Sequence, residues 1–294
     1  MKSAASVAVF LCVWAVAAGA QEVSQEFRGV EQVFGRPGEE KDGVLRVTFP
    51  RSDLRVKLHS VTIRAGLALT SWAAFQKAGD GTMMMGDLVL LGPEVQPVIS
   101  KLMEGGIEVT AIHNHLIGES PRVIYAHFHG HGNAAAMATA LRAALATTAT
   151  PLTTPRQRSA AEVPGLDAAK LGEILGRAGT SRGGVASFGI PRAEKILAGG
   201  ISLGPRMGMA TAINFQADGS GAATTGDFVL VASEVQPVIH ALRENGIEVT
   251  AVHNHMLDEE PRLFFLHFWG RDDAQRLARG LRAALDQTNH VKKP

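Results

Sequence analysis

Hydrophobic and polar positions along this chain follow two periods, and segments of the two kinds succeed one another in a fixed order. Residues 83–91, 107–115 and 122–129 are typical of strands with a buried face. Residues 93–102 and 133–145 carry apolar positions at helical spacing, and the first begins with proline while the second follows an asparagine cap. The order strand, helix, strand, strand, helix predicts a sheet with helices on one face.

The segment before this run predicts further strands. A short amphipathic helix, an alternating strand, one or two short strands and a longer strand are expected in turn at residues 26–36, 44–49, 54–63 and 67–76. A turn at residues 78–81 then joins the last of them to 83–91 as a hairpin.

The whole pattern occurs twice. Val95–Ile99 recurs unchanged at Val235–Ile239, an offset of 140 residues that also relates position 113 to position 253. The repeat predicts two homologous units, residues 21–146 and 163–290, joined by a linker at 147–162 that is rich in Thr, Pro and Ser. The predicted class is α+β, with a mixed or antiparallel sheet in each unit and a pseudo-twofold axis between the units.

Residues 1–20 have the features of a signal peptide. Lys2 precedes an apolar run, Ala4–Val16, that is too short to cross a bilayer comfortably, and Ala18 and Ala20 fit a cleavage site. We therefore expect cleavage after Ala20 and export to the periplasm or the medium; a retained anchor is the alternative. No other apolar run is long enough to span a membrane, so no stable span is expected after cleavage.

Composition narrows the classes of partner and ligand. The formal net charge is +1, which provides no basic field for nucleic acid, so a small molecule or a cell-envelope ligand is the expected partner. Cys12 is the only cysteine and lies in the predicted leader, so a mature chain would have neither disulfides nor thiolate ligands.

The chemistry is concentrated in the repeated stretch, residues 106–129 and 246–269, where each copy contains His-Asn-His, a Glu, Pro-Arg and a further His. Alternate residues of a strand share a face, so the two histidines of each triplet project together and can begin a metal site. The sequence predicts one site for a divalent ion, zinc first, in each unit: His113, His115 and His127 in the first, and His253, His255, His267 and Glu259 in the second. His127 and His267 reach the site only if the strand register permits it.

Three further residues fit catalytic roles in the first unit. Glu119 or His129 could act as the base for a metal-bound water, and Arg122 could hold an anionic group of the substrate. An exported metal-binding protein acting as a hydrolase on cell-envelope material is the first hypothesis. A non-catalytic periplasmic binding protein, for a metal ion or a small ligand, is the second. A structural domain with hydrogen-bonded histidines is the third, so whether the protein is an enzyme stays open.

The repeated pair Gly86-Asp87 and Gly226-Asp227 has two interpretations. Each aspartate can be a turn residue, which we favour from sequence, or an acceptor that orients a metal-binding histidine.

These motifs resemble a known family. The segments Gly-Asp-(Leu/Phe)-Val-Leu, Glu-Val-Gln-Pro-Val, Gly-Ile-Glu-Val-Thr-Ala-x-His-Asn-His and His-Phe-x-Gly resemble the LppY/LpqO family of exported bacterial proteins, once in each unit. The resemblance implies export with a signal or lipoprotein leader and assigns no activity. Cys12 lies inside the apolar run, which departs from the lipoprotein leader.

Overall fold

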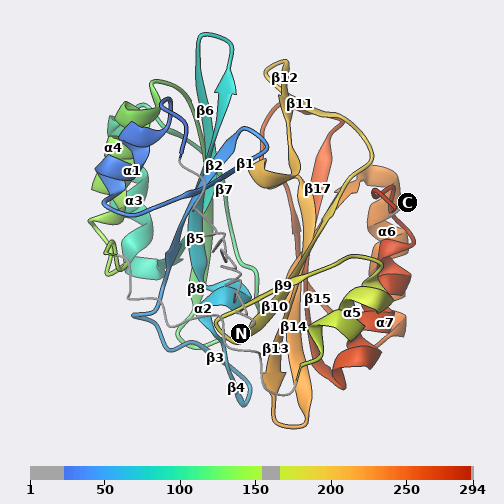
Figure 1. The fold of residues 1–294 in the computed structure, drawn as a ribbon. Coiled ribbons are helices and arrows are strands. Elements are labelled where there is room, and N and C mark those ends of the chain that lie inside the picture. The colour runs from blue at the N-terminus through green and yellow to red at the C-terminus, as the bar shows by residue number, and fades with distance from the viewer. Residues whose placement is uncertain (1–22, 154–165, 293–294) are drawn as a thin grey trace, which may run out of the picture.

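A computed structural model of the chain describes residues 23–153 and 166–292. Each unit forms a six-stranded antiparallel sheet with helices on one face, and the two sheets lie against each other with their helices outward (Figure 1). The predicted α+β class with two similar units is therefore confirmed. The predicted signal peptide and residues 154–162 of the predicted linker lie outside the described residues.

The two units repeat the same succession of elements, except that the two-residue strand β16 has no counterpart in the first unit. The first contains helices α1 (Arg28–Phe34), α2 (Ala65–Ala68), α3 (Gly92–Glu104) and α4 (Ala134–Leu145) and strands β1 (Glu39–Lys41), β2 (Val44–Pro50), β3 (Lys57–Leu58), β4 (Val61–Thr62), β5 (Thr70–Ala78), β6 (Gly81–Leu91), β7 (Glu108–His113) and β8 (Val123–Gly132). The second contains helices α5 (Ala168–Leu175), η1 (Pro205–Met207), α6 (Ala232–Glu244) and α7 (Ala274–Leu285) and strands β9 (Thr180–Arg182), β10 (Val185–Pro191), β11 (Ile196–Ala198), β12 (Ile201–Leu203), β13 (Ala210–Asp218), β14 (Gly221–Val231), β15 (Glu248–His253), β16 (Glu259–Glu260) and β17 (Leu263–Asp272).

The sheets have matching strand orders, β1-β2-β5-β6-β8-β7 and β9-β10-β13-β14-β17-β15. The predicted hairpin is present, because β5 and β6 pair from Trp72↔Asp87 to Ala78↔Gly81. One prediction was wrong: the strand expected at 67–76 begins only at Thr70. Residues 65–68 form α2 instead, and Thr70 Oγ1 closes this turn by donating to the Ala65 carbonyl at 2.8 Å.

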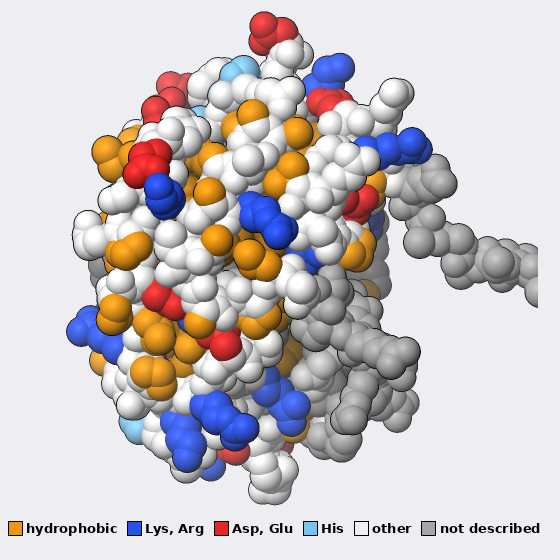
Figure 2. All heavy atoms as spheres, turned by 90° about the vertical axis from the view of Figure 1, so that its left-hand side faces the viewer, with side chains coloured by type: hydrophobic (Ala, Val, Ile, Leu, Met, Phe, Trp, Pro, Cys, Tyr) orange, Lys and Arg blue, Asp and Glu red, His pale blue; other side chains and the backbone are white. Residues whose placement is uncertain are grey.

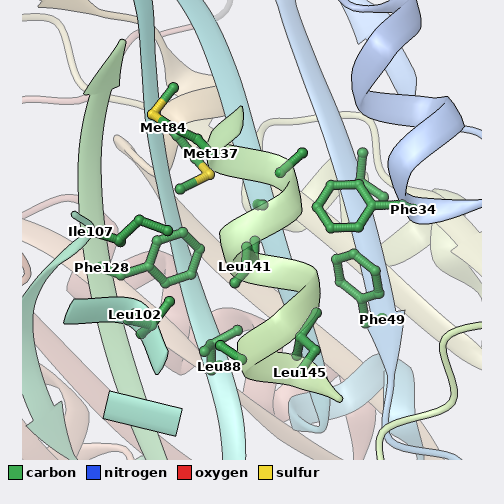
Figure 3. Close-up of a cluster of buried hydrophobic side chains, with 14 of the residues drawn as sticks. Phe34, Phe49, Met84, Leu88, Leu102, Ile107, Phe128, Met137, Leu141 and Leu145 are labelled. Carbon is green, nitrogen blue, oxygen red and sulfur yellow. The ribbon is translucent and has the colours of Figure 1, made fainter. Parts of the chain in front are cut away.

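Each unit has an apolar core between its helices and the outer face of its sheet. In the first unit Phe34 of α1, Phe49 of β2, Phe128 of β8 and Leu141 of α4 are buried together (Figure 3). The rings of Phe34 and Phe49 meet edge to face, with centroids 5.0 Å apart. Fully burying such a side chain contributes roughly 1.5–3 kcal/mol, which fixes the outer face of each sheet.

The inner faces of the two sheets share two further apolar clusters. Met85 packs in one cluster with Phe265 of the other unit, and Tyr125 packs in the other cluster with Trp269. The molecule therefore has four layers: helices, sheet, sheet, helices (Figure 1). The outer helical surface of the first unit carries side chains of both signs, interspersed (Figure 2), in keeping with the small net charge.

Contacts between the sheets follow the pseudo-twofold axis. Gln76 Nε2 donates to the Ser202 carbonyl at 2.8 Å, and the equivalent Gln216 Nε2 donates to the Thr62 carbonyl at 2.8 Å. The two hydrogen bonds are therefore equivalent, one donated by each unit to the other. Among the described residues, no helix has the length and apolar character needed to cross a membrane.

A buried arginine ties strands to a helix in each unit. Arg51, after β2, donates to Asp53, to the Val89 carbonyl and to Glu94 of α3. Arg192 makes the same contacts in the second unit, with Glu194, the Val229 carbonyl and Glu234.

Candidate metal centre

The centre begins with the pairing of two neighbouring strands in each sheet. Asp87 on β6 lies directly across from His127 on β8, and Asp227 on β14 lies across from His267 on β17. Phe128 points into the helical core, so alternation turns the side chain of His127 toward the other sheet. The register that sequence could not fix therefore places this histidine on the inner face.

The His-Asn-His triplets lie where β7 and β15 end. Each strand shifts register near its start, between Val109 and Ala111 in β7 and between Val249 and Ala251 in β15. The residue at the shift, Thr110, donates through Oγ1 to the His255 carbonyl at 2.6 Å, and its equivalent Thr250 donates to the His115 carbonyl at 2.5 Å. Each triplet is thus anchored to the other unit.

Six histidines gather in one cluster between the sheets. The imidazoles of His113 and His253 stack across the units with centroids 3.6 Å apart. The pairs His115 with His267 and His127 with His255 have centroids 3.7 and 3.6 Å apart. The two stretches that sequence suggested as separate sites therefore form one centre, and we call these six residues the histidine cluster.

Hydrogen bonds set the proton position on four of these rings. Nδ1 of His127 faces the Gly86 carbonyl at 3.2 Å, and Nδ1 of His267 faces the Gly226 carbonyl at 2.9 Å. Nδ1 of His113 and of His253 each face the carbonyl of the following asparagine at 3.2 Å. A carbonyl only accepts, so Nδ1 carries the proton and Nε2 keeps its lone pair.

The Nε2 atoms of all six rings are buried and lack a hydrogen-bond partner within residues 23–153 and 166–292. Buried polar atoms without partners are uncommon and call for an explanation, of which a bound ion is one. In one group, atoms of Asp87, His113, His115 and His127 all lie within 4.8 Å of one another. A second group of the same compactness joins His113 to His253 and His255, so His113 belongs to both.

Asp87 completes the first group with a carboxylate. Its Oδ2 lies 3.7 Å from Nε2 of His115, and its Oδ1, which is buried without a hydrogen-bond partner in the described part of the chain, lies 3.9 Å from Nε2 of His127. Its mate Asp227 enters neither group, so the pseudo-symmetry of the centre is incomplete.

Burial keeps the imidazoles neutral. It lowers the pKa of His113 to about 3, with a further contribution from His253, and lowers the pKa of His253 to about 4. The other four pKa values lie well below the ordinary range for the same main reason. Burial also raises the pKa of Asp87 well above its usual value and that of Asp227 to about 7. Neutral imidazole is the form that binds metal ions.

The remaining predicted residues lie outside the histidine cluster. Glu119 accepts from the Val123 amide at 3.2 Å, and Glu259 accepts from the Leu263 amide at 2.8 Å and pairs with Arg262. These carboxylates close their own loops and join neither converging group. His129 Nδ1 faces Glu108 at 3.7 Å. Arg122 is exposed beside Glu119 on a separate cavity.

Asp87 is the residue whose role sequence reasoning undervalued. It lies in the middle of β6, so its interpretation as a turn residue was wrong. The signal was the repeated Gly-Asp pair. A Cβ on Gly86 would lie 2.2 Å from the Trp72 carbonyl oxygen, so only glycine permits the close strand approach that also presents its carbonyl to His127.

A cavity of about 490 Å³ opens beside the histidine cluster. His115, His127, His255 and His267 line it, with Asp87 and Asp227, and both units contribute its walls. A small molecule in this cavity would therefore contact the centre directly.

Comparison with known proteins identifies a family and little beyond it. A family model described as Domain of Unknown Function (DUF1259) matches residues 28–147 and again residues 169–287. No curated protein sequence matches the chain.

Two solved structures show distant similarity. The trimeric bacterial microcompartment shell protein PduB is 13% identical, with 87% of this chain and 96% of that chain covered and a TM-score of 0.24. EtuB from Clostridium kluyveri is 10% identical, with 84% and 88% covered and a TM-score of 0.20. At these TM-scores the similarity carries no argument about this chain.

Proposed function

This chain belongs to the family described as Domain of Unknown Function (DUF1259), and from its own residues we propose that it is an exported metal-binding protein whose centre is the histidine cluster. The observation that carries the proposal is the convergence of buried, unpartnered Nε2 atoms from both units, joined by Asp87. Export rests on the leader predicted at residues 1–20, and the resemblance to the LppY/LpqO family stays a prediction.

The donor set selects a class of metal. Imidazole suits Zn²⁺, Cu²⁺, Ni²⁺ and Fe²⁺, whereas Mg²⁺ and Ca²⁺ prefer oxygen ligands. The only cysteine lies in the predicted leader, so soft thiolate sites are not expected. Asp87, His113, His115 and His127 would hold the ion, with His253 and His255 available for a second one or for a larger shell. Zinc is the first candidate.

The cavity favours a centre that a small molecule can reach. A structural zinc site is closed by protein ligands, whereas a catalytic site keeps an open position. Here the cavity is lined by four of the six histidines, which supports metal-dependent hydrolysis of a small or cell-envelope molecule. When bound, the ion would polarise the scissile group and lower the pKa of a bound water. A non-catalytic binding protein is the alternative, and a metal shell with no exchangeable position would favour it.

Metal analysis of the purified protein tests the proposal. We expect co-purifying transition metal, and an increase in thermal stability when zinc is added after chelation, since binding to the folded state alone stabilises by about 2.7 kcal/mol at 100 times the dissociation constant. His113→Ala should lose most of this effect. His240→Ala is the matched control because this histidine is exposed on α6. Wild-type protein that neither contains metal nor responds to zinc, copper, nickel or iron would refute the proposal.

A second measurement separates enzyme from binding protein. The zinc-loaded chain should hydrolyse a panel of activated esters and phosphoesters at a rate that falls on chelation and returns with metal. Tight metal binding with no turnover on any of them would favour the binding-protein alternative.

A further inference from the structure

The cavity beside the histidine cluster departs from the pseudo-symmetry of the molecule in its charge. Residues 65–70 and 205–210, which are equivalent at an offset of 140, both border it. Arg206 occupies the position that corresponds to Gly66. Arg46 likewise corresponds to Ser187, because β2 and β10 are equivalent at an offset of 141.

The third difference is aromatic. Trp72 on β5 corresponds to Ala212 on β13, and both border the cavity. Duplication of a symmetric unit would have given two equal halves. Instead two guanidinium groups and an indole ring border the cavity where small side chains stand at the equivalent positions, and Arg177 and Asp42 are further charged residues of its lining.

Arg46 is held in place by its surroundings. Its guanidinium carbon lies 3.9 Å from the centroid of the Trp72 ring, a cation–π contact, and its Nη1 donates to the Arg206 carbonyl at 3.3 Å. Burial lowers the pKa of Arg46 to about 10 and the charge of Arg206 adds to this, while the carboxylates of Asp227, Asp87 and Glu39 act in the opposite direction. Within residues 23–153 and 166–292, Arg46 forms no ion pair with a carboxylate at 4.0 Å or less.

Arg206, from the other unit, borders the same cavity and is held by Glu39 of β1. Its Nη1 pairs with Glu39 at 3.1 Å and its Nη2 donates to the Glu39 carbonyl at 2.8 Å. Its Nε is buried with no hydrogen-bond partner in the described part of the chain. Two neighbouring positive groups repel each other; Glu39 offsets the charge of Arg206 in part, and an anion at the two arginines would reduce the remaining repulsion and pair the free donors.

We propose that this cavity binds a small molecule with a carboxylate or phosphate group, whose oxyanion lies at Arg46 and Arg206 while the rest of the molecule extends toward the histidine cluster. Arginine suits such oxyanions because its planar fork of donors matches their geometry. The flat face of Trp72 keeps the Arg46 fork in a fixed orientation. The asymmetry gives the bound molecule one direction in the cavity.

The inference rests on the proposed function for the identity of the second contact, but the anion contact can be measured without metal. Calorimetric titration with inorganic phosphate and with acetate should therefore be run on chelator-stripped protein and on zinc-loaded protein. At least one anion is expected to bind the stripped protein. The double variant Arg46→Gln with Arg206→Gln should weaken that binding about tenfold or more, as expected for loss of charge-assisted hydrogen bonds.

Matched variants distinguish anion binding at a specific site from a general effect of the protein's net charge. The double variant Arg55→Gln with Arg279→Gln changes the net charge equally at exposed positions that do not line the cavity, and it should bind as wild type does. Arg206→Gln alone and Arg46→Lys keep the test valid if the double variant fails to fold, and each should give intermediate weakening.

The possible outcomes lead to different conclusions. Binding of phosphate alone or of acetate alone identifies the anion class and supports the inference. Stripped wild-type protein that binds neither anion, or a folded Arg46/Arg206 double variant that binds as tightly as wild type, overturns it. Anion binding in a protein that takes up no metal would refute the proposed metal centre and leave this inference standing.

Discussion

At the scale of single residues, the centre depends on what surrounds each imidazole as much as on the imidazoles. The backbone carbonyls of Gly86 and Gly226 accept from Nδ1 of His127 and His267 and so fix the tautomer of these rings. The carbonyls can take these positions because glycine, which has no Cβ, allows the neighbouring strand to come close. The sequence could indicate the histidines by their repetition. It could not indicate that Nε2 rather than Nδ1 would be the free atom, because this depends on the strand register.

Asp87 should contribute more to metal affinity than its mate. Asp87→Asn removes a carboxylate that lies 3.7 Å from His115 and 3.9 Å from His127. We expect zinc affinity to fall about 10- to 100-fold or more, since loss of a residue that only supports a ligand already costs about that much. Asp227→Asn, in the equivalent position, should have a smaller effect because Asp227 belongs to neither converging group. Competition with a chromophoric chelator measures both affinities. Equal losses would show that the two halves of the centre are equivalent.

Gly86→Ala should destabilise the fold. The new Cβ would lie 2.2 Å from the Trp72 carbonyl oxygen and 2.3 Å from the Phe128 ring, so the strands must separate at a cost of about 1–3 kcal/mol or more. Gly189→Ala is the control, since its Cβ would meet nothing within 4 Å. Chemical denaturation of both variants gives the difference directly. A Gly86→Ala protein as stable as wild type would mean that β5 and β6 are farther apart than described.

At the scale of elements, most of the fold follows from sequence pattern. The helices α3 and α4 and the strands β2, β6 and β8 match their predicted segments closely. Each has recognisable end signals, such as a proline or a capping residue, or a regular hydrophobic period. Residues 65–68 were mispredicted because a single helical turn carries too few residues to show a period. Its ends are set by long-range and local hydrogen bonds, from the Arg64 amide to Gln216 and from Thr70 to Ala65, and the first of these is invisible in sequence.

The ion pair between Arg51, which follows β2, and Glu94 of α3 leads us to a prediction about stability in acid. Burial alone would raise the pKa of Glu94, but hydrogen bonds from Arg51 and the Leu91 amide outweigh it and lower that pKa below 4.5; the pKa of Glu194 is lowered in the same way by Arg192. A carboxyl group with a depressed pKa in the folded state stabilises above its unfolded value, and this stabilisation is lost as the pH falls through the folded value.

Thermal melts between pH 7 and pH 3 should therefore show stability declining below about pH 4.5, and Glu94→Gln should be less stable than wild type at pH 7 and less dependent on pH in that range. Glu104→Gln is the control, because this residue is exposed at the end of α3 and its ion pair, with Lys101, is on the surface. If Glu94→Gln melts in parallel with wild type across the range, the Arg51 link contributes nothing to acid stability.

At the scale of the whole molecule, the duplication creates a histidine cluster that neither unit could form alone. The three-histidine sets of the two units meet at the pseudo-twofold axis, where each ring of one stacks on a ring of the other. Sequence repetition indicated two equivalent units, but it contains no information on which faces meet. The joint centre was therefore beyond sequence reasoning.

A shared centre and two separate sites predict different responses to single substitutions. His113 belongs to both converging groups, whereas His115 belongs to the first and His255 to the second. His113→Ala should therefore reduce zinc affinity more than His115→Ala or His255→Ala, because it removes a donor from every arrangement that the cluster offers.

Separate sites would instead give, for each variant, loss of one equivalent of metal with the affinity of the other equivalent unchanged. Titration with zinc, following both stoichiometry and affinity in the three variants and in His240→Ala, distinguishes these outcomes. Because the rings of both units stack at one axis, we expect the affinity of the whole centre to change in every cluster variant, including those altered only in the second unit.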